Sequence, residues 1–270
     1  MTPSPADLLD LAVATAREAA ALVTRERGRA AAAVDVKSSP TDVVTAVDTA
    51  TERLVTGRLL GARPDDGLLG EEGADRAGTS GVRWVVDPID GTVNFLYGLR
   101  PYAVSIAAQV GGVSVAGAVL DVPSGDLFTA TRGGGAWLTT AADPAPVRLT
   151  GTRPPSLGHT LVATGFGYRA EQRREQGAVV AQLLPEVRDI RRGGCSSVDV
   201  CSVAAGRVDA YYELGLKPWD HAAAALVAEE AGLVVTGIHG RPFAEPMAVV
   251  APGTVAGPLV ALLERLHAPG

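Results

Sequence analysis

The hydrophobic positions near the start of the chain repeat with the period of a helix. Apolar residues recur every three or four positions over 5–27, with charged residues between them, which predicts an amphipathic helix that ends at Gly28. Residues 34–39 have an extended pattern. Thr41-Asp42 offers a cap for a second helix that begins with Val43 and Val44. We interpret the first helix as scaffold.

The middle of the chain has a pattern typical of strands. Small and β-branched residues flank Gly111-Gly112 on both sides, which predicts a hairpin of strands 102–110 and 113–120, followed by a strand at 127–131. The glycines at 133–135 lack the Lys-Ser/Thr of a phosphate-binding loop, so we interpret them as a turn.

The second half alternates between strand and helix, and this favours a sheet covered by helices. A Pro-rich stretch near 140–156 is where we expect the molecule to divide, if it divides. The predicted segments are strands at 159–164, 187–190, 209–212, 233–235 and 247–250, and helices at 172–184, 196–205, from Pro218 onward, and from Val255 to about Leu266.

Composition narrows the class of protein. With 270 residues and 47% hydrophobic content, the chain is long enough for one large domain or two closely packed halves. No run approaches the roughly 18 apolar residues that span a membrane, and the N-terminus lacks a signal pattern, so we expect a cytoplasmic protein with no membrane partner. Cys195 and Cys201, six apart in a predicted helix, are expected to be buried thiols rather than a disulfide.

The charge balance points to cations rather than polyanions as partners. The net charge of −6 disfavours a general nucleic-acid or anionic-membrane binder. An acidic site that gathers metal ions fits this balance better.

The strongest chemical signal is the run DPIDGT at 87–92, which follows a buried apolar strand. Pro88 favours an extended conformation for Asp87, so the carboxylates of Asp87 and Asp90 can converge on one side of a tight turn, joined by the Ile89 carbonyl. Oxygen ligands of this kind suit Mg2+. The run alone is also compatible with an ordinary strand followed by a turn.

The two residues that follow suit a phosphate. Gly91 allows backbone to approach a ligand closely, and Thr92 adds a hydroxyl beside exposed amides.

Other acids are ambiguous when taken singly. Asp48, one helical turn before Glu52, and the loop pair Glu71-Glu72 are more often solvated charges. Asp220, in the first turn of a helix, is more often a cap. His221 is a tempting general base, but we interpret it as a packing or surface residue.

Four motifs taken together resemble the inositol monophosphatases, a family of lithium-sensitive, magnesium-dependent phosphatases. The motifs are VKSSPTDVVTAVDTATE at 36–52, GEE at 70–72, DPIDGTVNF at 87–95 and LKPWDHAAAALVAEEAG at 216–232. The resemblance implies an α/β fold with five layers, αβαβα. It also implies an N-terminal half, 1–145, with most metal ligands, and a C-terminal half, 146–270, with Glu213 and Asp220, in one compact unit that usually forms a homodimer.

The resemblance also implies a site and a reaction. The reaction would be Mg2+-dependent hydrolysis of a phosphate monoester, with inositol 1-phosphate as the first candidate substrate. It would be inhibited by lithium and would not pass through a covalent phosphoenzyme. The implied ligands are Glu71, Asp87 and the Ile89 carbonyl for one Mg2+, Asp87, Asp90 and Asp220 for a second, and Glu71 for a loosely held third. The implied catalytic residues are Glu71, Thr92 and Asp48, and the implied substrate-binding residues are Gly91, Thr92, Glu213 and Ser196.

The sequence departs from the family pattern in two places. Ser196 and Ser197 stand where the family often has alanines, and Ala223-Ala224 replace a more usual glycine-containing pair. Neither departure touches an implied metal ligand, but both bear on the shape of the pocket.

Three alternatives stay open. Relatives within the family hydrolyse histidinol phosphate, 3′-phosphoadenosine phosphates or fructose bisphosphate, although the Asn94-Phe95 ending is more similar to the inositol branch. A regulatory protein that binds RNA or transcription machinery, and a purely structural metal-binding protein, are the others. The structural protein is disfavoured because it would have no use for Thr92 and Asp48.

Overall fold

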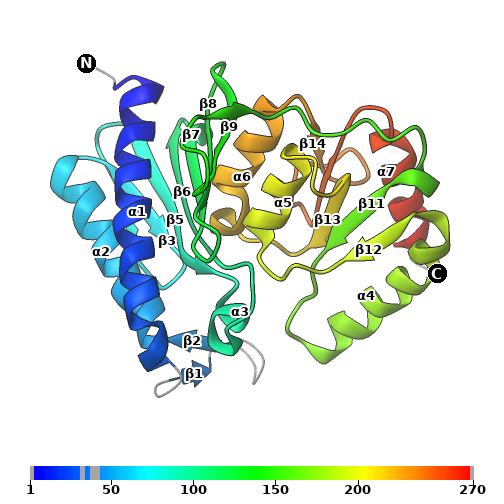
Figure 1. Cartoon of the computed structure of the whole chain (residues 1–270), viewed down its shortest axis with the longest axis horizontal. Helices are drawn as coiled ribbons and strands as arrows, with labels where there is room; N and C mark the ends of the chain where they lie inside the picture. Colours follow the sequence, from blue (N-terminus) through cyan, green and yellow to red (C-terminus); the bar gives the residue numbers. More distant parts are fainter. Residues whose placement is uncertain (1–2, 31–33, 37–42, 268–270) are drawn as a thin grey trace.

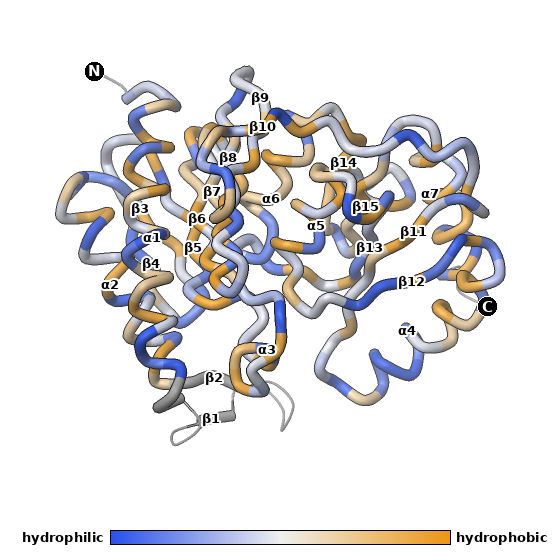
Figure 2. Tube along the Cα trace, viewed as in Figure 1, coloured by the Kyte–Doolittle hydropathy of each residue, from blue (hydrophilic) through white to orange (hydrophobic). Residues whose placement is uncertain are grey.

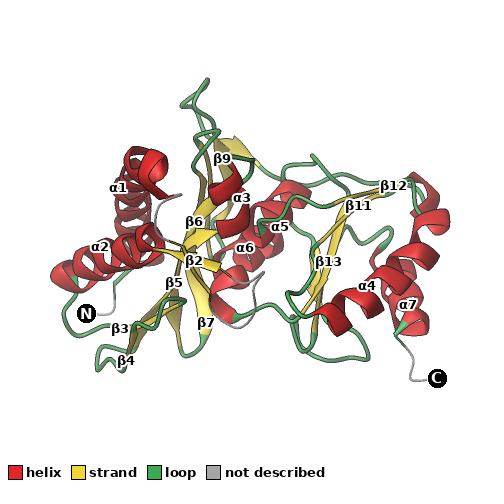
Figure 3. Cartoon of the chain, turned by 90° about the horizontal axis from the view of Figure 1, so that it is seen from below, coloured by secondary structure: helices red, strands yellow, loops and turns green. Residues whose placement is uncertain are grey.

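The computed structural model describes residues 3–30, 34–36 and 43–267 of the chain. Its helices and sheets stack in five layers, helix, sheet, helix, sheet, helix, as Figures 1 and 3 show from two directions. The three helical layers, from the N-terminal side, are α1 (Pro5–Ala30) with α2 (Ala46–Ala62), α5 (Ser196–Ala204) with α6 (Pro218–Glu230), and α4 (Ala170–Leu183) with α7 (Ala256–Leu266). This is the αβαβα arrangement that the family resemblance implies.

The first sheet has eight strands in the order β10-β9-β8-β7-β6-β5-β3-β4. All neighbours are antiparallel except β3 and β5, which run parallel. The strands are β3 (Gly67–Gly70), β4 (Asp75–Arg76), β5 (Val82–Asp90), β6 (Ala103–Val110), β7 (Val113–Asp121), β8 (Asp126–Thr131), β9 (Gly135–Thr139) and β10 (Val147–Arg148). Both outermost strands, β4 and β10, are only two residues long.

The second sheet has five strands in the order β12-β11-β13-β15-β14. Its β11 runs parallel to both β12 and β13, and the other pairs are antiparallel. The strands are β11 (Leu161–Thr164), β12 (Asp189–Arg191), β13 (Ala210–Leu214), β14 (Val234–Thr236) and β15 (Met247–Ala251). The short elements elsewhere are β1 (Val34–Val36), β2 (Val43–Thr45), α3 (Thr92–Tyr97) and the 3-10 turns Leu157–His159 and Leu184–Glu186.

Apolar side chains fill the space between successive layers, and Figure 2 marks the hydrophobic stretches along the chain. One core lies between α1, α2 and the first sheet, a second between the two sheets around α5 and α6, and a third beneath α4 and α7. Helix α6 lies very close to β7. A Cβ added at Gly117 would stand 3.1 Å from the backbone of Ala223, so the sheet supplies a glycine at this contact and the helix keeps its alanine.

Several predicted elements are confirmed, with small shifts at their ends. The first helix continues to Ala30 rather than ending at Gly28, and the strand predicted at 159–164 begins at Leu161 because Leu157–His159 forms a 3-10 turn. The strand that carries Asp87 does not end there but continues to Asp90.

The predicted start of the second helix is wrong. Val43 and Val44 belong to β2, which pairs antiparallel with β1, and the helix begins at Ala46. β-Branched residues lose side-chain freedom in a helix and fit a paired strand better, so the two valines extend the chain until Ala46. The proposed Thr41-Asp42 cap lies outside the described residues.

The division of the chain at 145/146 stays a prediction. The first sheet extends slightly past that point, because β10 pairs with β9. The core between the sheets contains residues from both halves, including Phe128 and Tyr211. Among the described residues, no helix combines the length and the apolar character needed to span a bilayer.

Candidate active site

The end of β5 places two acids beside each other at the edge of a cleft. The strand passes through Pro88, and its pairing with β6 shifts register between Asp87 and Asp90. Such an irregularity is where a strand tolerates proline and redirects its side chains. The Ile89 amide donates to Oδ1 of Asp87 at 3.1 Å. Asp87 and Asp90 are both buried, at 1% and 9% exposure.

A sharp turn follows and opens α3. Gly91 has φ of 87°, in the left-handed region that favours glycine, and a Cβ there would lie 3.1 Å from the carbonyl oxygens of Gly194 and Pro101. The next residue, Thr92, begins α3 and lines the cleft.

Asp48 lies directly behind Thr92. The Thr92 hydroxyl is 3.1 Å from Oδ1 of Asp48 and 3.0 Å from the Ile89 carbonyl oxygen, so it donates its single proton to one of these acceptors at a time. Asp48 is fully buried in the first turn of α2. This location contradicts the interpretation of Asp48 as a solvated charge and fits an acceptor that orients the threonine.

Glu52 organises the loop that carries Glu71. Its carboxylate accepts hydrogen bonds from the amides of Glu72 at 2.8 Å and Ala74 at 3.0 Å. A Cβ on Gly70 would come within 2.2 Å of Oε2 of Glu52, so any larger residue there would displace this carboxylate. Sequence reasoning noted Glu52 one turn after Asp48 but missed this role.

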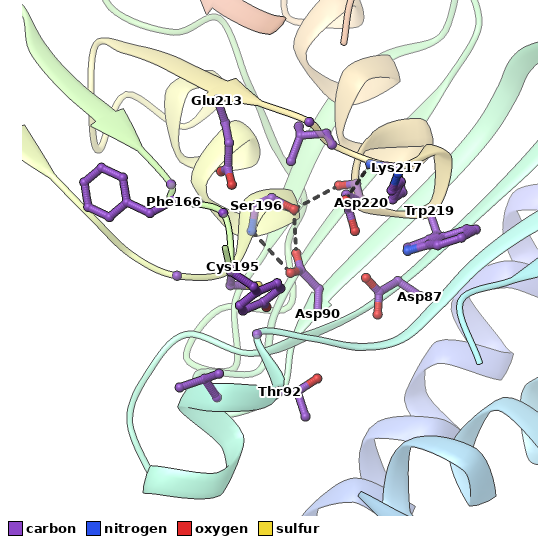
Figure 4. Close-up of a pocket in the computed structure, with 18 of the residues that line it drawn as sticks. Asp87, Asp90, Thr92, Phe166, Cys195, Ser196, Glu213, Lys217, Trp219 and Asp220 are labelled. Carbon is purple, nitrogen blue, oxygen red and sulfur yellow. Dashed lines mark hydrogen bonds between the residues drawn. The ribbon is translucent and has the colours of Figure 1, made fainter. Parts of the chain in front are cut away.

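Helix α5 holds Asp90 from the opposite half of the chain. Oδ2 of Asp90 accepts from the Ser197 amide at 2.7 Å, the Ser197 hydroxyl at 2.6 Å and the Ser196 hydroxyl at 3.2 Å. Figure 4 shows Ser196 pointing toward Asp90 and Asp220. The Ser196 hydroxyl is also 3.3 Å from the backbone carbonyl oxygen of Asp220, so Ser196 contacts the acids as well as lining the cleft.

Asp220 enters from the first turn of α6. Pro218 begins the helix, and the Lys217 amide donates to Oδ2 of Asp220 at 2.6 Å. Trp219 lies beside it in the lining of the cleft (Figure 4).

Glu213 stands near the end of β13, on the far side of the cleft from Thr92 (Figure 4). The Tyr211 hydroxyl donates to Oε2 of Glu213 at 2.5 Å. A Cβ on Gly165 would lie 2.0 Å from the same oxygen, so the carboxyl group is packed against backbone although the residue is partly exposed. This burial raises the pKa of Glu213 to about 7, and the Tyr211 hydrogen bond opposes the rise.

All of these elements meet at one cleft of about 590 Å³. Every predicted site residue lines it except Asp48, which lies buried behind Thr92. The predicted residues in its lining are Glu71, Asp87, Ile89, Asp90, Gly91, Thr92, Ser196, Glu213 and Asp220. Arg169, Arg192 and Lys217 also line the cleft and carry positive charge.

The acids in the cleft are crowded. Burial raises the pKa of Asp87 well above its usual range, and the neighbouring carboxylates of Glu71, Asp90 and Asp220 raise it further. Burial, followed by the charge of Asp90, likewise raises the pKa of Asp220. Several buried carboxylates are costly to ionise together, so bound cations would reduce the electrostatic repulsion between them.

The donor set therefore suits a hard divalent ion, because it consists of carboxylates and a backbone carbonyl. Within the described part of the chain, no three acidic, histidine or cysteine side chains already form a closed metal cage. In this arrangement Asp90 is hydrogen-bonded to the start of α5, and Asp220 is hydrogen-bonded to the Lys217 amide.

His221 does not take part. It packs edge-on against Phe243, with ring centroids 5.3 Å apart, and burial lowers its pKa to about 4. A histidine that stays neutral near pH 7 agrees with the interpretation as a packing residue.

Cys195 and Cys201 are both free thiols and both buried, as predicted.

The comparisons with known proteins all point to one family. A model of the inositol monophosphatase family matches residues 4–268. An inositol-1-monophosphatase of Mycobacterium bovis is 47% identical over 279 residues, covering 97% of this chain and 95% of the relative. The Nus factor SuhB of Escherichia coli is 38% identical over 235 residues, covering 86% of each chain. The solved structure of Mycobacterium tuberculosis SuhB has a TM-score of 0.84 at 44% identity and covers 98% of both chains.

Proposed function

The chain belongs to the inositol monophosphatase family, and from that premise we propose that its cleft hydrolyses inositol 1-phosphate with the help of Mg2+. It is a phosphatase, a phosphoric monoester hydrolase that acts on inositol phosphate. One observation carries the assignment of residues: acids from the end of β5, from the Glu71 loop and from the first turn of α6 line the same cleft as Thr92 and Glu213.

Glu71, Asp87, Asp90, Asp220 and the Ile89 carbonyl would hold two or three Mg2+ ions. Bound ions of this kind lower the pKa of water and neutralise a leaving oxygen in an in-line displacement at phosphorus. The crowding of acids supports this set, because burial first and the carboxylates of Glu71, Asp90 and Asp220 next raise the pKa of Asp87.

Thr92 and Asp48 would orient the attacking water. Asp48 accepts the hydrogen bond from the Thr92 hydroxyl, which leaves the threonine oxygen free to accept a hydrogen bond from water in the cleft. Glu71, on its loop fixed by Glu52, lines the same cleft and would accept a proton from that water as it attacks. Amides at Gly91 and Thr92, at the start of α3, would hold the phosphate oxygens.

Glu213 would bind the alcohol half of the substrate. A carboxylate at this position accepts hydrogen bonds from neighbouring ring hydroxyls, and it lies across the cleft from Thr92 (Figure 4). The cleft volume of about 590 Å³ accommodates a ring of that size beside a phosphate.

Two finer properties belong to the same proposal. Li+ would replace the ion held through Asp220 after the reaction and trap the phosphate, which predicts uncompetitive inhibition. The chain would also act as a homodimer. Both follow from family membership, and the measurements are steady-state inhibition kinetics with Li+ and sedimentation velocity.

The test of the proposal is phosphate release from a panel of inositol, histidinol, nucleotide and sugar phosphates. We expect inositol 1-phosphate to be the preferred substrate, with activity that disappears on adding a chelator and returns with Mg2+. Chelator-resistant turnover would contradict the metal mechanism, and preference for another ester would move the chain to a different branch of the family.

A regulatory role is the second candidate, because the E. coli relative is named a Nus factor. The net charge of −6 works against broad RNA binding by this chain. Filter binding with RNA measures it directly, and salt-resistant retention of RNA would favour the regulatory role.

A further inference from the structure

We propose that the Ser197 hydroxyl, assisted by Ser196, makes Asp90 a ligand through one oxygen only and so favours Mg2+ over the larger Ca2+. The inference rests on the proposed function, since it takes Asp90 as a metal ligand. It concerns the two serines that replace the alanines common in the family.

The two oxygens of Asp90 have different surroundings. Oδ2 accepts three hydrogen bonds, from the Ser197 amide at 2.7 Å, the Ser197 hydroxyl at 2.6 Å and the Ser196 hydroxyl at 3.2 Å. Oδ1 accepts the Ser196 amide at the longer distance of 3.3 Å. A carboxylate oxygen has about two lone-pair sites, so Oδ2 is saturated and Oδ1 has capacity left for a ligand.

The hydroxyls, rather than the amides, distinguish this chain. The amides of residues 196 and 197 open α5 and would donate whatever side chains stood there. The hydroxyls exist only because both residues are serine. Ser197 has no exposed surface, so water does not compete for its short bond to Oδ2.

This asymmetry has a consequence for the choice of ion. Mg2+ requires near-octahedral geometry and takes a carboxylate readily through one oxygen, whereas Ca2+ accepts more ligands and often binds both oxygens of a carboxylate. Donors that occupy Oδ2 leave the one-oxygen mode intact and obstruct the two-oxygen mode. The serines therefore select against Ca2+ without touching either ion.

The experiment is a calorimetric titration of the full chain with Mg2+ and, separately, with Ca2+, in the absence of substrate. The variants are Ser197→Ala and Ser196→Ala, and the control is Ser202→Ala, on the same helix but without a bond to Asp90. We expect Ser197→Ala to lower the Mg2+/Ca2+ affinity ratio roughly ten-fold, the effect of removing a group that orients a metal ligand. Ser196→Ala should lower it less, in line with its longer bond, and Ser202→Ala should leave it unchanged.

The outcomes separate the two proposals. If the unsubstituted chain binds no Mg2+ at this site, the proposed function fails. If it binds Mg2+ and Ser197→Ala leaves the ratio unchanged, or weakens both ions equally, only the present inference is overturned. If Ser197→Ala does not fold, judged by circular dichroism, Ser196→Ala decides: a lowered ratio supports the inference and an unchanged one overturns it.

Discussion

The two walls of the cleft are built in different ways. On the N-terminal wall, Asp87 is part of a nine-residue strand paired on both sides, and Asp48 is wholly enclosed in a helix. On the C-terminal wall, Glu213 stands near the end of a strand, and exposed residues Gly215 and Lys217 follow it. Asp87 and Glu213 both belong to strands inside a sheet, since Glu213 pairs with Ala248 of β15, but the chain that follows Glu213 is exposed whereas the surroundings of Asp87 and Asp48 are buried.

This structural difference matches a difference in the proposed functions of the two walls. Steps common to every phosphate ester, which are holding ions, water and phosphate, would use the rigid N-terminal wall, where small displacements are costly. Recognition of the alcohol would use the C-terminal wall, where a side chain is replaced with little effect on the sheet. Substitutions on the two walls should therefore have different signatures.

The largest expected effect is on the N-terminal wall. Asp90→Asn keeps the shape of the side chain but removes a charge from the proposed second ion site, and we expect kcat to fall at least about 100-fold, or about 2.7 kcal/mol of barrier. The loss should be equal for inositol 1-phosphate and p-nitrophenyl phosphate. Initial-rate assays at saturating Mg2+ measure this loss. An unchanged kcat would contradict the assignment of catalysis to the N-terminal wall.

On the C-terminal wall, Glu213→Gln should discriminate between substrates. A charge-assisted hydrogen bond is worth about 1.5–3 kcal/mol, so we expect kcat/KM for inositol 1-phosphate to fall about ten-fold or more. The simple ester should change far less. Comparing the two losses in the same preparation is the measurement, and equal losses would assign Glu213 to folding or metal binding instead.

The same wall should respond to pH. Burial raises the pKa of Glu213 to about 7, so the carboxylate that accepts ring hydroxyls forms as the pH rises through that value. We expect KM for inositol 1-phosphate to fall a few-fold between pH 6 and pH 8 relative to that of p-nitrophenyl phosphate. In Glu213→Gln this difference should disappear, and its persistence would rule out Glu213 as its source.

The smallest expected effect concerns stability behind the C-terminal wall. Asp199, in the first turn of α5, is 8% exposed, and burial followed by the charge of Glu213 raises its pKa to about 8. A raised pKa means that folding favours the protonated acid, so the contribution of Asp199 is full at low pH and is lost as the pH rises from about 4 to about 8.

Asp199→Asn cannot ionise and still accepts the hydrogen bond that the Gly194 amide gives to Asp199. We expect the fall in Tm between pH 6 and pH 9 to be smaller in this variant by a few degrees, as calorimetry in the presence of a chelator would measure. An unchanged slope would assign the fall to other groups.

Local patterns were the part of the molecule that the sequence could predict. The Asp87–Thr92 run predicts its turn and its acids because proline and glycine restrict backbone within a few residues. The layered fold and the site residues rested on the resemblance, because periodicity alone does not bring Glu71 beside Asp220. The sequence therefore identified the site residues at the end of β5 and in the first turn of α6. It did not identify the hydrogen bonds that hold these residues in place.

The missed features depend on contacts between distant segments. Ser197 bonds Asp90 from 107 positions away, and Glu52 bonds the Glu72 amide from 20 positions away. Neither contact has a local sequence signal beyond a polar residue in a helix. The misplaced helix start at Val43 has a different cause, since its valines were weighed as helix residues without the β1 strand that pairs with them.

The short outer strands of both large sheets limit how this protein can pair with other chains through its sheet edges. The sheets end in β4 and β10, of two residues each, and in β12 and β14, of three residues each. Edges this short offer few unpaired amides to a foreign strand, which is how natural sheet proteins avoid growing into fibrils. Any pairing of two copies must then use side chains rather than a continuous intermolecular sheet, and concentrated preparations should resist forming amyloid.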